Sequence, residues 1–474
     1  MSSATPARHV LTDWRPEDPE FWTSTGRSIA SRNLWISVPN LLLAFAIWMV
    51  WSMVVAKLKL IGFAFTTDQL FWLTALPALS GATLRIFYSF LVPILGGRLW
   101  TTVSTLSLLV PAVGIGLAVQ QPETPYWVFV ALALACGLGG GNFASSMSNI
   151  SFFYPKAEKG NALALNAGFG NLGVSVMQFL VPVVIVAGAF APVVGAPQVA
   201  MVGEARSELW LQNAGFVWIP FIIAAAVAAW VGMNDIASAK ASFASQAVVF
   251  KRKHNWIMCY LYLGTFGSFI GFSAAFPLLM NTLFPEVNSL QYAFLGPLVG
   301  AAARALTGWV SDKFGGEHVT HWVFLAMAAG VGAVLYSIGA WGAEPSFPLF
   351  FASFIWLFAW TGIGNASTFQ MIPAIMRSDM PRLMPKADAA ARLKASDMES
   401  AAIVGFSSAI GAYGGFVIPK LFGESLKATG GPETALLIFL AFYLSCVAVN
   451  WAFYGRKTSM LHGPQQPSTL GAAQ

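Results

Sequence analysis

Two short segments of the chain share the same spacing of arginine and glycine. Residues 85–97 read RIFYSFLVPILGG, and residues 304–316 read RALTGWVSDKFGG. In each segment the arginine precedes a pair of glycines by eleven residues, and the two segments lie 219 residues apart. Self-similarity at a fixed interval is typical of a chain built from repeated structural units. The pattern therefore indicates two related halves.

Other matches near the same interval extend this repeat through both halves. Trp35-Ile36 corresponds to Trp256-Ile257 at an interval of 221 residues, and Gly141-Asn142 corresponds to Gly364-Asn365. These matches follow one another in the same order in each half. The sequence thus predicts two pseudo-symmetric units of equal helix number.

The composition indicates that these units lie in a membrane. Of the 474 residues, 57% are hydrophobic and 10% are charged, whereas soluble domains carry about 25% charged residues. A water-soluble enzyme is thereby excluded. Since a helix needs about 20 apolar residues to cross a bilayer, twelve spans can be marked. They are 34–56, 71–95, 100–120, 125–153, 162–189, 212–233, 254–281, 291–311, 320–341, 346–376, 400–423 and 432–454.

The predicted fold is an all-α membrane protein with twelve transmembrane helices, because only helices and closed barrels satisfy the backbone in lipid and no barrel pattern is present. We expect no removable signal peptide at the amino terminus. The expected segments are an N-terminal segment (1–33), a first six-helix half (34–233), a linker (234–253), a second six-helix half (254–454) and a tail (455–474).

Basic residues in alternate loops predict the orientation of the chain. Nineteen Lys and Arg residues fall on the side of both termini, against five on the other side, and cytoplasmic loops carry the excess. Both termini are therefore expected in the cytoplasm. This distribution also accounts for the net charge of +6, so no nucleic-acid partner is expected. The five basic residues expected on the side opposite the termini are Lys57, Lys59, Arg206, Lys420 and Lys427.

Two arginines, Arg85 and Arg304, remain inside predicted spans, whereas every Asp, Glu and His falls in a loop, a tail or a span end. Ionisable residues inside a membrane are usually functional, and these two cations have no carboxylate in the spans to pair with. A small anion between them would relieve their repulsion. Because a guanidinium forms two coplanar hydrogen bonds, carboxylate, nitrate and nitrite suit the site, and phosphate stays an alternative.

Glycines restrict the size of the expected site. They cluster in the fifth and eleventh spans, where small residues allow helices to approach closely. A narrow cavity favours an anion of few atoms. The glycines assigned to packing or hinge roles are Gly168, Gly170, Gly173, Gly405, Gly411 and Gly414.

The sequence predicts no enzyme, no cofactor and no metal site. Cys136, Cys259 and Cys446 lack the spacing of metal ligands, and there is no histidine pair for haem. A membrane redox enzyme is thus a poor alternative, and an anion channel would differ by its faster flux. We expect a monomer in the lipid bilayer.

The segment Gly308–Gly316 resembles the loop motif of the major facilitator superfamily, although the first half has Ser89 and Pro93 at the corresponding positions. Nearly the whole chain further resembles the NarK-type nitrate/nitrite porters of that superfamily. Four stretches carry this resemblance: TDWRPEDPEFW (12–22), GNFASSMSNISFFYPK (141–156), AGFGNLGVSVMQ (167–178) and GFSSAIGAYGGFVIP (405–419).

The resemblance implies a transporter of the cell inner membrane whose two halves rock around a central site. It implies that nitrate is clamped by Arg85 and Arg304, lies between the rings of Phe143 and Phe266, and receives hydrogen bonds from the residues Asn171, Tyr262 and Ser408. Since no titratable group was found inside the spans, we hypothesise antiport, nitrate in and nitrite out. The alternatives are proton-coupled nitrate symport and antiport of another anion such as phosphate.

Overall fold

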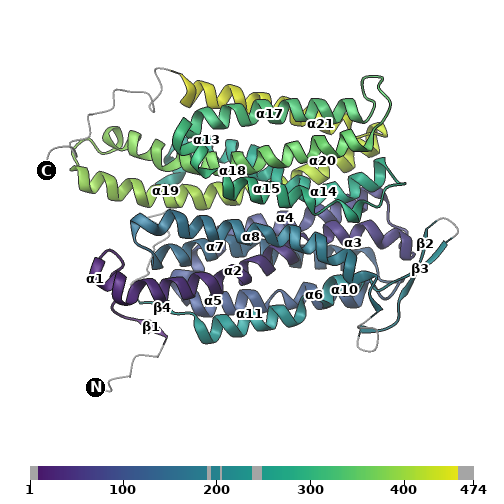
Figure 1. Ribbon diagram of the computed structural model, residues 1–474, viewed down its shortest axis with the longest axis horizontal. Helices are drawn as coiled ribbons and strands as arrows, with labels where there is room; N and C mark the ends of the chain where they lie inside the picture. Colours follow the sequence, from purple (N-terminus) through teal and green to yellow (C-terminus); the bar gives the residue numbers. More distant parts are fainter. Residues whose placement is uncertain (1–8, 189–193, 203–204, 238–247, 457–474) are drawn as a thin grey trace.

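The structure is a computed structural model, which describes residues 9–188, 194–202, 205–237 and 248–456 (Figure 1). Parts of the predicted linker and of both terminal segments lie outside these residues. The first half contains β1 (Val10–Leu11), α1 (Pro19–Phe21), η1 (Trp22–Gly26), α2 (Arg27–Met49), α3 (Trp51–Leu58), η2 (Lys59–Ile61), α4 (Thr67–Leu95), α5 (Gly97–Leu106), α6 (Leu109–Ala118), α7 (Tyr126–Phe153), α8 (Lys156–Ile185), β2 (Gln198–Val202), β3 (Ala205–Leu209), α10 (Asn213–Phe216) and α11 (Ile219–Gly232).

The second half repeats this helical order after the short strand β4. Its elements are β4 (Asp235–Ile236), η4 (Val248–Lys251), α13 (Lys253–Tyr262), η5 (Leu263–Gly267), α14 (Ser268–Leu283), η6 (Ser289–Gln291), α15 (Leu295–Leu306), α16 (Gly308–Phe314), α17 (Gly316–Ser337), α18 (Phe347–Leu383), α19 (Ala389–Ala412), α20 (Gly414–Thr429), α21 (Glu433–Asn450) and η7 (Trp451–Gly455).

The described residues confirm a helical membrane fold. Eleven helices are long and apolar enough to cross a bilayer, and a pair bent by 46°, Ser289–Leu306 with Gly308–Phe314, makes a twelfth when it is counted as one span. This bent pair is the predicted eighth span. The predicted and observed spans therefore differ mainly at their ends.

Several helices extend beyond the apolar stretches that predicted them. The first begins at Pro19 rather than residue 34, because the Asp18 side chain accepts from the backbone N–H of Glu20 and Phe21 and thus caps the helix. α18 continues to Leu383, and α19 begins at Ala389, eleven residues before the predicted span. Polar helical turns thus project from the bundle at these ends.

The two halves form two layers, with α2 to α11 in one and α13 to α21 in the other (Figure 1). One end of the bundle carries β1, α1 and the first turns of α8, α13 and α19. We call this end the terminal face, and the other end the opposite face. Contacts between the halves run mainly through α4 with α20 and α19, α8 with α15, and α3 with α14.

Short strands occur at both faces and were not predicted. At the terminal face β1 pairs in parallel with β4, so the N-terminal segment is joined to the start of the linker. At the opposite face β2 and β3 form an antiparallel hairpin between α8 and α10. These additions leave the helical core unchanged.

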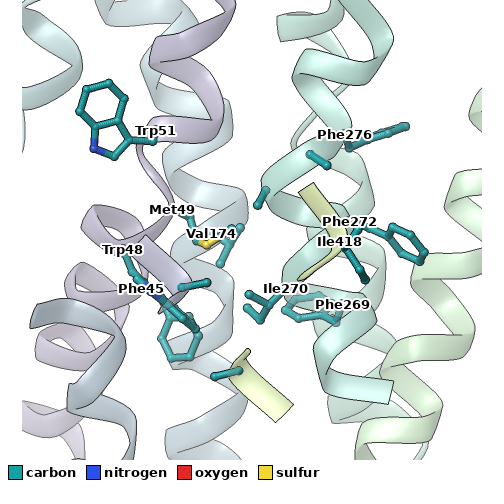
Figure 2. Packing of buried hydrophobic residues seen from close by; sticks show 14 of the residues in the cluster. Phe45, Trp48, Met49, Trp51, Val174, Phe269, Ile270, Phe272, Phe276 and Ile418 are labelled. Carbon is teal, nitrogen blue, oxygen red and sulfur yellow. The ribbon is translucent and has the colours of Figure 1, made fainter. Parts of the chain in front are cut away.

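Apolar side chains fill the interior where the two halves meet. Phe45, Trp48 and Met49 lie on the first half, and Phe269 and Phe272 lie on the second (Figure 2). Figure 2 shows Val174 and Ile270 between these two groups. All of these side chains are buried, so the polar groups among them need specific partners.

Candidate anion site

Arg85 on α4 is held by both halves. The side chain is 1% exposed, Nε donates to the Gly140 carbonyl at 2.8 Å, and Nη1 donates to the Ser408 carbonyl at 3.0 Å. Gly140 belongs to α7 and Ser408 to α19. The remaining nitrogen, Nη2, has no hydrogen-bond partner among the described residues. A buried charged donor without a partner is unfavourable, so this nitrogen is suited to an anion.

Aromatic rings surround the Arg85 guanidinium. Its Cζ lies 4.9 Å from the ring centroid of Trp48, 4.8 Å from that of Phe143 and 5.2 Å from that of Phe266. The negative faces of aromatic rings attract a cation, and this attraction grows where water is excluded. The rings therefore stabilise the buried charge without neutralising it.

Phe143 and Phe266 face each other from different halves. Their ring centroids lie 6.4 Å apart and their planes are inclined by 27°. Because carbon atoms in contact are separated by about 3.5 Å, this spacing is close to that of two rings with one flat layer between them. From these centroid distances, the midpoint between the rings lies about 3.8 Å from Arg85 Cζ. Arg85 N–H groups can thus reach a flat anion there.

Arg304 on α15 lies against a second set of rings. Its Cζ is 5.3 Å from the centroid of Phe369, and Phe369 stacks on Tyr262 with centroids 4.3 Å apart. Tyr262 in turn stacks on Phe266 at 5.3 Å and 11°. A column of nearly parallel rings therefore leads from Arg304 to the gap beside Arg85.

Several buried polar atoms around this column have no hydrogen-bond partner among the described residues. Asn171 lies on α8, which packs against α15, the helix of Arg304, and its buried side-chain amide is one of the groups without a partner in the described part of the chain. Buried polar atoms are normally satisfied, so a group of unsatisfied ones indicates a ligand site. The atoms are Arg85 Nη2, Arg304 Nη1, Tyr262 Oη, and Asn171 Oδ1 and Nδ2.

Neither arginine forms a salt bridge within the part of the chain that the structure describes. The Tyr262 side chain is near enough to both guanidinium groups to interact electrostatically with each, and the two cations also repel each other. The site therefore combines two positive charges with neutral polar groups and flat rings.

The structure brings five of the seven proposed binding side chains to this region, places Asn171 on the neighbouring helix α8, and places Ser408 differently. The Ser408 hydroxyl donates to the Gly405 carbonyl of its own helix at 2.7 Å, and the residue contacts Arg85 through its backbone oxygen. Sequence reasoning missed Trp48, Phe369 and the Gly140 carbonyl. No sequence signal separates these rings from the rest of the chain's 18 tryptophans and 38 phenylalanines.

The glycines assigned to packing fall into two groups. A Cβ atom would meet Leu41 at 2.7 Å from Gly170 and Tyr262 at 2.8 Å from Gly411, and it would also clash at Gly173 and Gly414. These four positions need glycine for close packing. At Gly405 nothing lies within 4 Å of an added Cβ, and at Gly168 only Ala305 does. These two positions border open space in the present conformation.

Three titratable groups that the sequence placed at the ends of spans are buried inside the protein. Asp379 on α18, Glu399 on α19 and His254 on α13 are all buried near the terminal face. The sequence placed them at span ends because α18 and α19 run past their apolar stretches. The absence of such groups therefore no longer supports antiport.

Comparison with known proteins agrees with this architecture. The family model described as Major Facilitator Superfamily matches residues 36–391. The nitrate/nitrite transporter NarU of Salmonella typhimurium strain LT2 is 53% identical over 95% of this chain and 97% of that protein. The probable nitrate/nitrite antiporter NarK2 of Thermus thermophilus is 41% identical over 94% of this chain and 97% of that protein.

Among solved structures, a bacterial homologue of the human lysosomal transporter Spinster, in an inward-facing and occupied conformation, has a TM-score of 0.61 at 14% identity. The match covers 90% of this chain and 96% of that chain, and it shows the shared fold. Together with the family match and the two relatives, this fold shows that the chain belongs to the NarK-type nitrate/nitrite porters of the Major Facilitator Superfamily.

Proposed function

We propose that this transporter exchanges nitrate for nitrite by alternating access, with the anion held between Arg85 and Arg304. The observation that carries the proposal is a pair of guanidinium nitrogens that are unpartnered within the described residues. Arg85 Nη2 lies beside the gap between Phe143 and Phe266, and Arg304 Nη1 lies at the other end of the column of rings. The names of the relatives with 53% and 41% identity support these two substrates.

The geometry favours a flat anion over a tetrahedral one. A ring separation of 6.4 Å accommodates one planar layer, whereas the out-of-plane oxygens of phosphate would force the rings apart. Nitrate and nitrite are planar and accept hydrogen bonds in their own plane. The two guanidinium groups and the Tyr262 hydroxyl can therefore act at the edge of the anion while the rings cover its faces.

Exchange follows from the charge of the site. With no anion bound, closing the two halves would bring two unneutralised cations together in a medium of low dielectric constant. A bound anion relieves this repulsion and thus stabilises the occluded state relative to the open states. The halves then rock only when loaded, so inward transport of nitrate is matched by outward transport of nitrite.

We further propose that the terminal face is cytoplasmic and that the protein acts as a monomer in the inner membrane. The distribution of basic residues supports this orientation. A cysteine at Lys427, on the opposite face, should react with an impermeant maleimide added to intact cells. A cysteine at Lys394 on α19 should react only after the membrane is opened; the reverse pattern would overturn the orientation.

Counterflow in proteoliposomes tests exchange against symport. Vesicles loaded with nitrite should take up labelled nitrate, and empty vesicles should not, with or without a pH gradient. Robust uptake into empty vesicles driven by a pH gradient would instead establish proton symport. Addition of phosphate in excess should leave nitrate uptake unchanged, and effective competition by phosphate would contradict the preference for a flat anion.

A further inference from the structure

A second group of buried polar atoms lies near the terminal face, away from the anion site. His254 Nδ1 is 2.9 Å from the Tyr454 hydroxyl, and His254 Nε2 is 3.8 Å from Asp379 Oδ2. Both the His254 and Asp379 side chains are 3% exposed. His254 Nε2 has no hydrogen-bond partner among the described residues. The imidazole is therefore held at one nitrogen and unsatisfied at the other.

Other charged residues lie around His254 and Asp379. Arg252 donates to Glu399 through Nε at 2.7 Å and Nη2 at 2.6 Å, and this hydrogen bonding raises the pKa of Arg252 above its ordinary value. Arg252 and Glu399 are thus each other's partners. Arg382 contacts Asp379 Oδ1 at 3.0 Å, but its side chain is 61% exposed. The charged or titratable groups that act on His254 are Lys253, Asp379, Arg382 and Tyr454, and Arg252 lies near Asp379 while it pairs with Glu399.

This pair joins the ends of two helices that form one wall of the anion site. His254 lies eight residues before Tyr262 on α13, which is about 12 Å of helix, and Asp379 lies ten residues after Phe369 on α18, about 15 Å. Tyr262 and Phe369 are the rings that stack at 4.3 Å. The segment η5, which carries Phe266, is a π-helix, a feature frequent at functional sites.

We propose that His254 and Asp379 form a proton-binding site whose occupancy is linked to anion exchange. A proton from water converts the imidazole to an imidazolium, which donates from one nitrogen to the Tyr454 oxygen and from the other to the Asp379 carboxylate. The second contact then shortens from 3.8 Å toward the ~2.8 Å of a charge-assisted hydrogen bond. No electron transfer or other reactant is involved.

Protonation would tighten the present packing of α13 against α18. Exchange requires the wall that carries Tyr262 and Phe266 to move when the halves rock. A proton that stabilises the present packing of α13 against α18 must slow the change to the other conformation. By linkage, a bound anion that favours one conformation must also change the proton affinity of the His254–Asp379 site. Exchange should therefore slow as pH falls and His254 takes up its proton.

The test uses self-exchange of isotope-labelled nitrate against nitrate, with the same pH on both sides of the proteoliposome membrane. Nitrate remains an anion from pH 5 to pH 8, so only the protein titrates. Wild type should lose roughly threefold or more of its rate between pH 8 and pH 5.5. His254→Gln and Asp379→Asn should remove this dependence. His318→Gln, which changes an exposed histidine near the same face, should keep the wild-type profile.

Each outcome separates this proposal from the proposed function on which it rests. No nitrate exchange by wild type at any pH would reject the proposed function. Exchange with a flat wild-type pH profile would reject the proton site alone, whatever the variants do. A wild-type profile retained by His254→Gln or Asp379→Asn would reject it as well. Membrane abundance and melting temperature of each variant show that its fold is intact.

Discussion

Phe143 and Phe266 come from different halves of the protein and face each other with ring centroids 6.4 Å apart. The Arg85 guanidinium lies beside this gap and is hydrogen-bonded to backbone oxygens of both halves. An anion between the rings would thus contact both moving units at once. A bound anion would therefore favour the closed arrangement of the two halves.

Replacing either clamp arginine by lysine should sharply reduce exchange. Arg85→Lys and Arg304→Lys keep the charge but lose the planar fork, and a hydrogen bond to a charged group contributes about 1.5–3 kcal/mol. We expect nitrate exchange to fall roughly 10- to 150-fold in proteoliposomes. Arg392→Lys, on the terminal-face end of α19, is the control and should exchange normally. A near-normal exchange rate in either variant would show that the substituted arginine does not bind the anion.

Removing the Tyr262 hydroxyl should weaken anion binding without weakening the fold. Tyr262→Phe keeps the stacking with Phe266 and Phe369, and the deleted hydroxyl is buried with no partner among the described residues. We expect nitrate affinity to fall about fivefold, equivalent to about 1 kcal/mol, while the melting temperature stays equal or rises. Unchanged affinity together with a lower melting temperature would show a structural role instead.

Shortening either facing ring should reduce the preference for flat anions. Phe143→Leu and Phe266→Leu remove one face of the sandwich and one cation–π contact to Arg85, which is worth about 0.5–2 kcal/mol. Nitrate exchange should become weaker and more sensitive to competition by tetrahedral anions. Phe179→Leu changes a ring that is 54% exposed on α8 and should have little effect. Unaltered selectivity in both site variants would contradict the sandwich.

An ion pair between the halves at the opposite face should bias the conformation. Lys420 on α20 lies 3.4 Å from Asp68 on α4 and also pairs with Glu424 of its own helix. Asp68→Asn removes the contact between halves, whereas the control Glu424→Gln removes only the contact within α20. Such pairs contribute up to about 1 kcal/mol, so a shift of up to roughly fivefold between states is expected.

A cysteine at Ala78 reports this shift, because Ala78 lies at the interface with Gly415 of α20. Its reaction with an impermeant thiol reagent from the opposite face should speed up in Asp68→Asn and stay unchanged in Glu424→Gln. The three native cysteines are buried and give little background. Equal labelling in both backgrounds would show that the Asp68 contact does not hold this face closed.

Hydropathy and the charge inventory predicted the fold class and singled out Arg85 and Arg304, because both depend on transfer of residues into lipid. The spacing of matching residues predicted the repeat. The partners of Arg85 could not be predicted in this way. Two of them are the backbone oxygens of Gly140 and Ser408. Because every residue has a backbone carbonyl, the residue type does not indicate which carbonyl accepts a hydrogen bond. Phe143 and Phe266 came only from the family resemblance, and Phe369 and Trp48 came only from the structure.

The buried titratable groups show a different limit of sequence reasoning. A predicted span ends at the first charged residues, but the helix itself can continue inside the protein. α18 and α19 do so, and Asp379 and Glu399 are therefore buried by neighbouring helices rather than exposed in loops. Local hydropathy predicts which residues contact lipid, but it does not predict which polar residues are buried against other helices.

A structure determined in nitrate tests the central claim most directly. We predict density for a planar anion between the rings of Phe143 and Phe266, with its oxygens within hydrogen-bonding distance of Arg85 Nη2 and Arg304 Nη1. Nitrate bound elsewhere, or either guanidinium paired with a carboxylate of the protein while nitrate is present, would contradict the account.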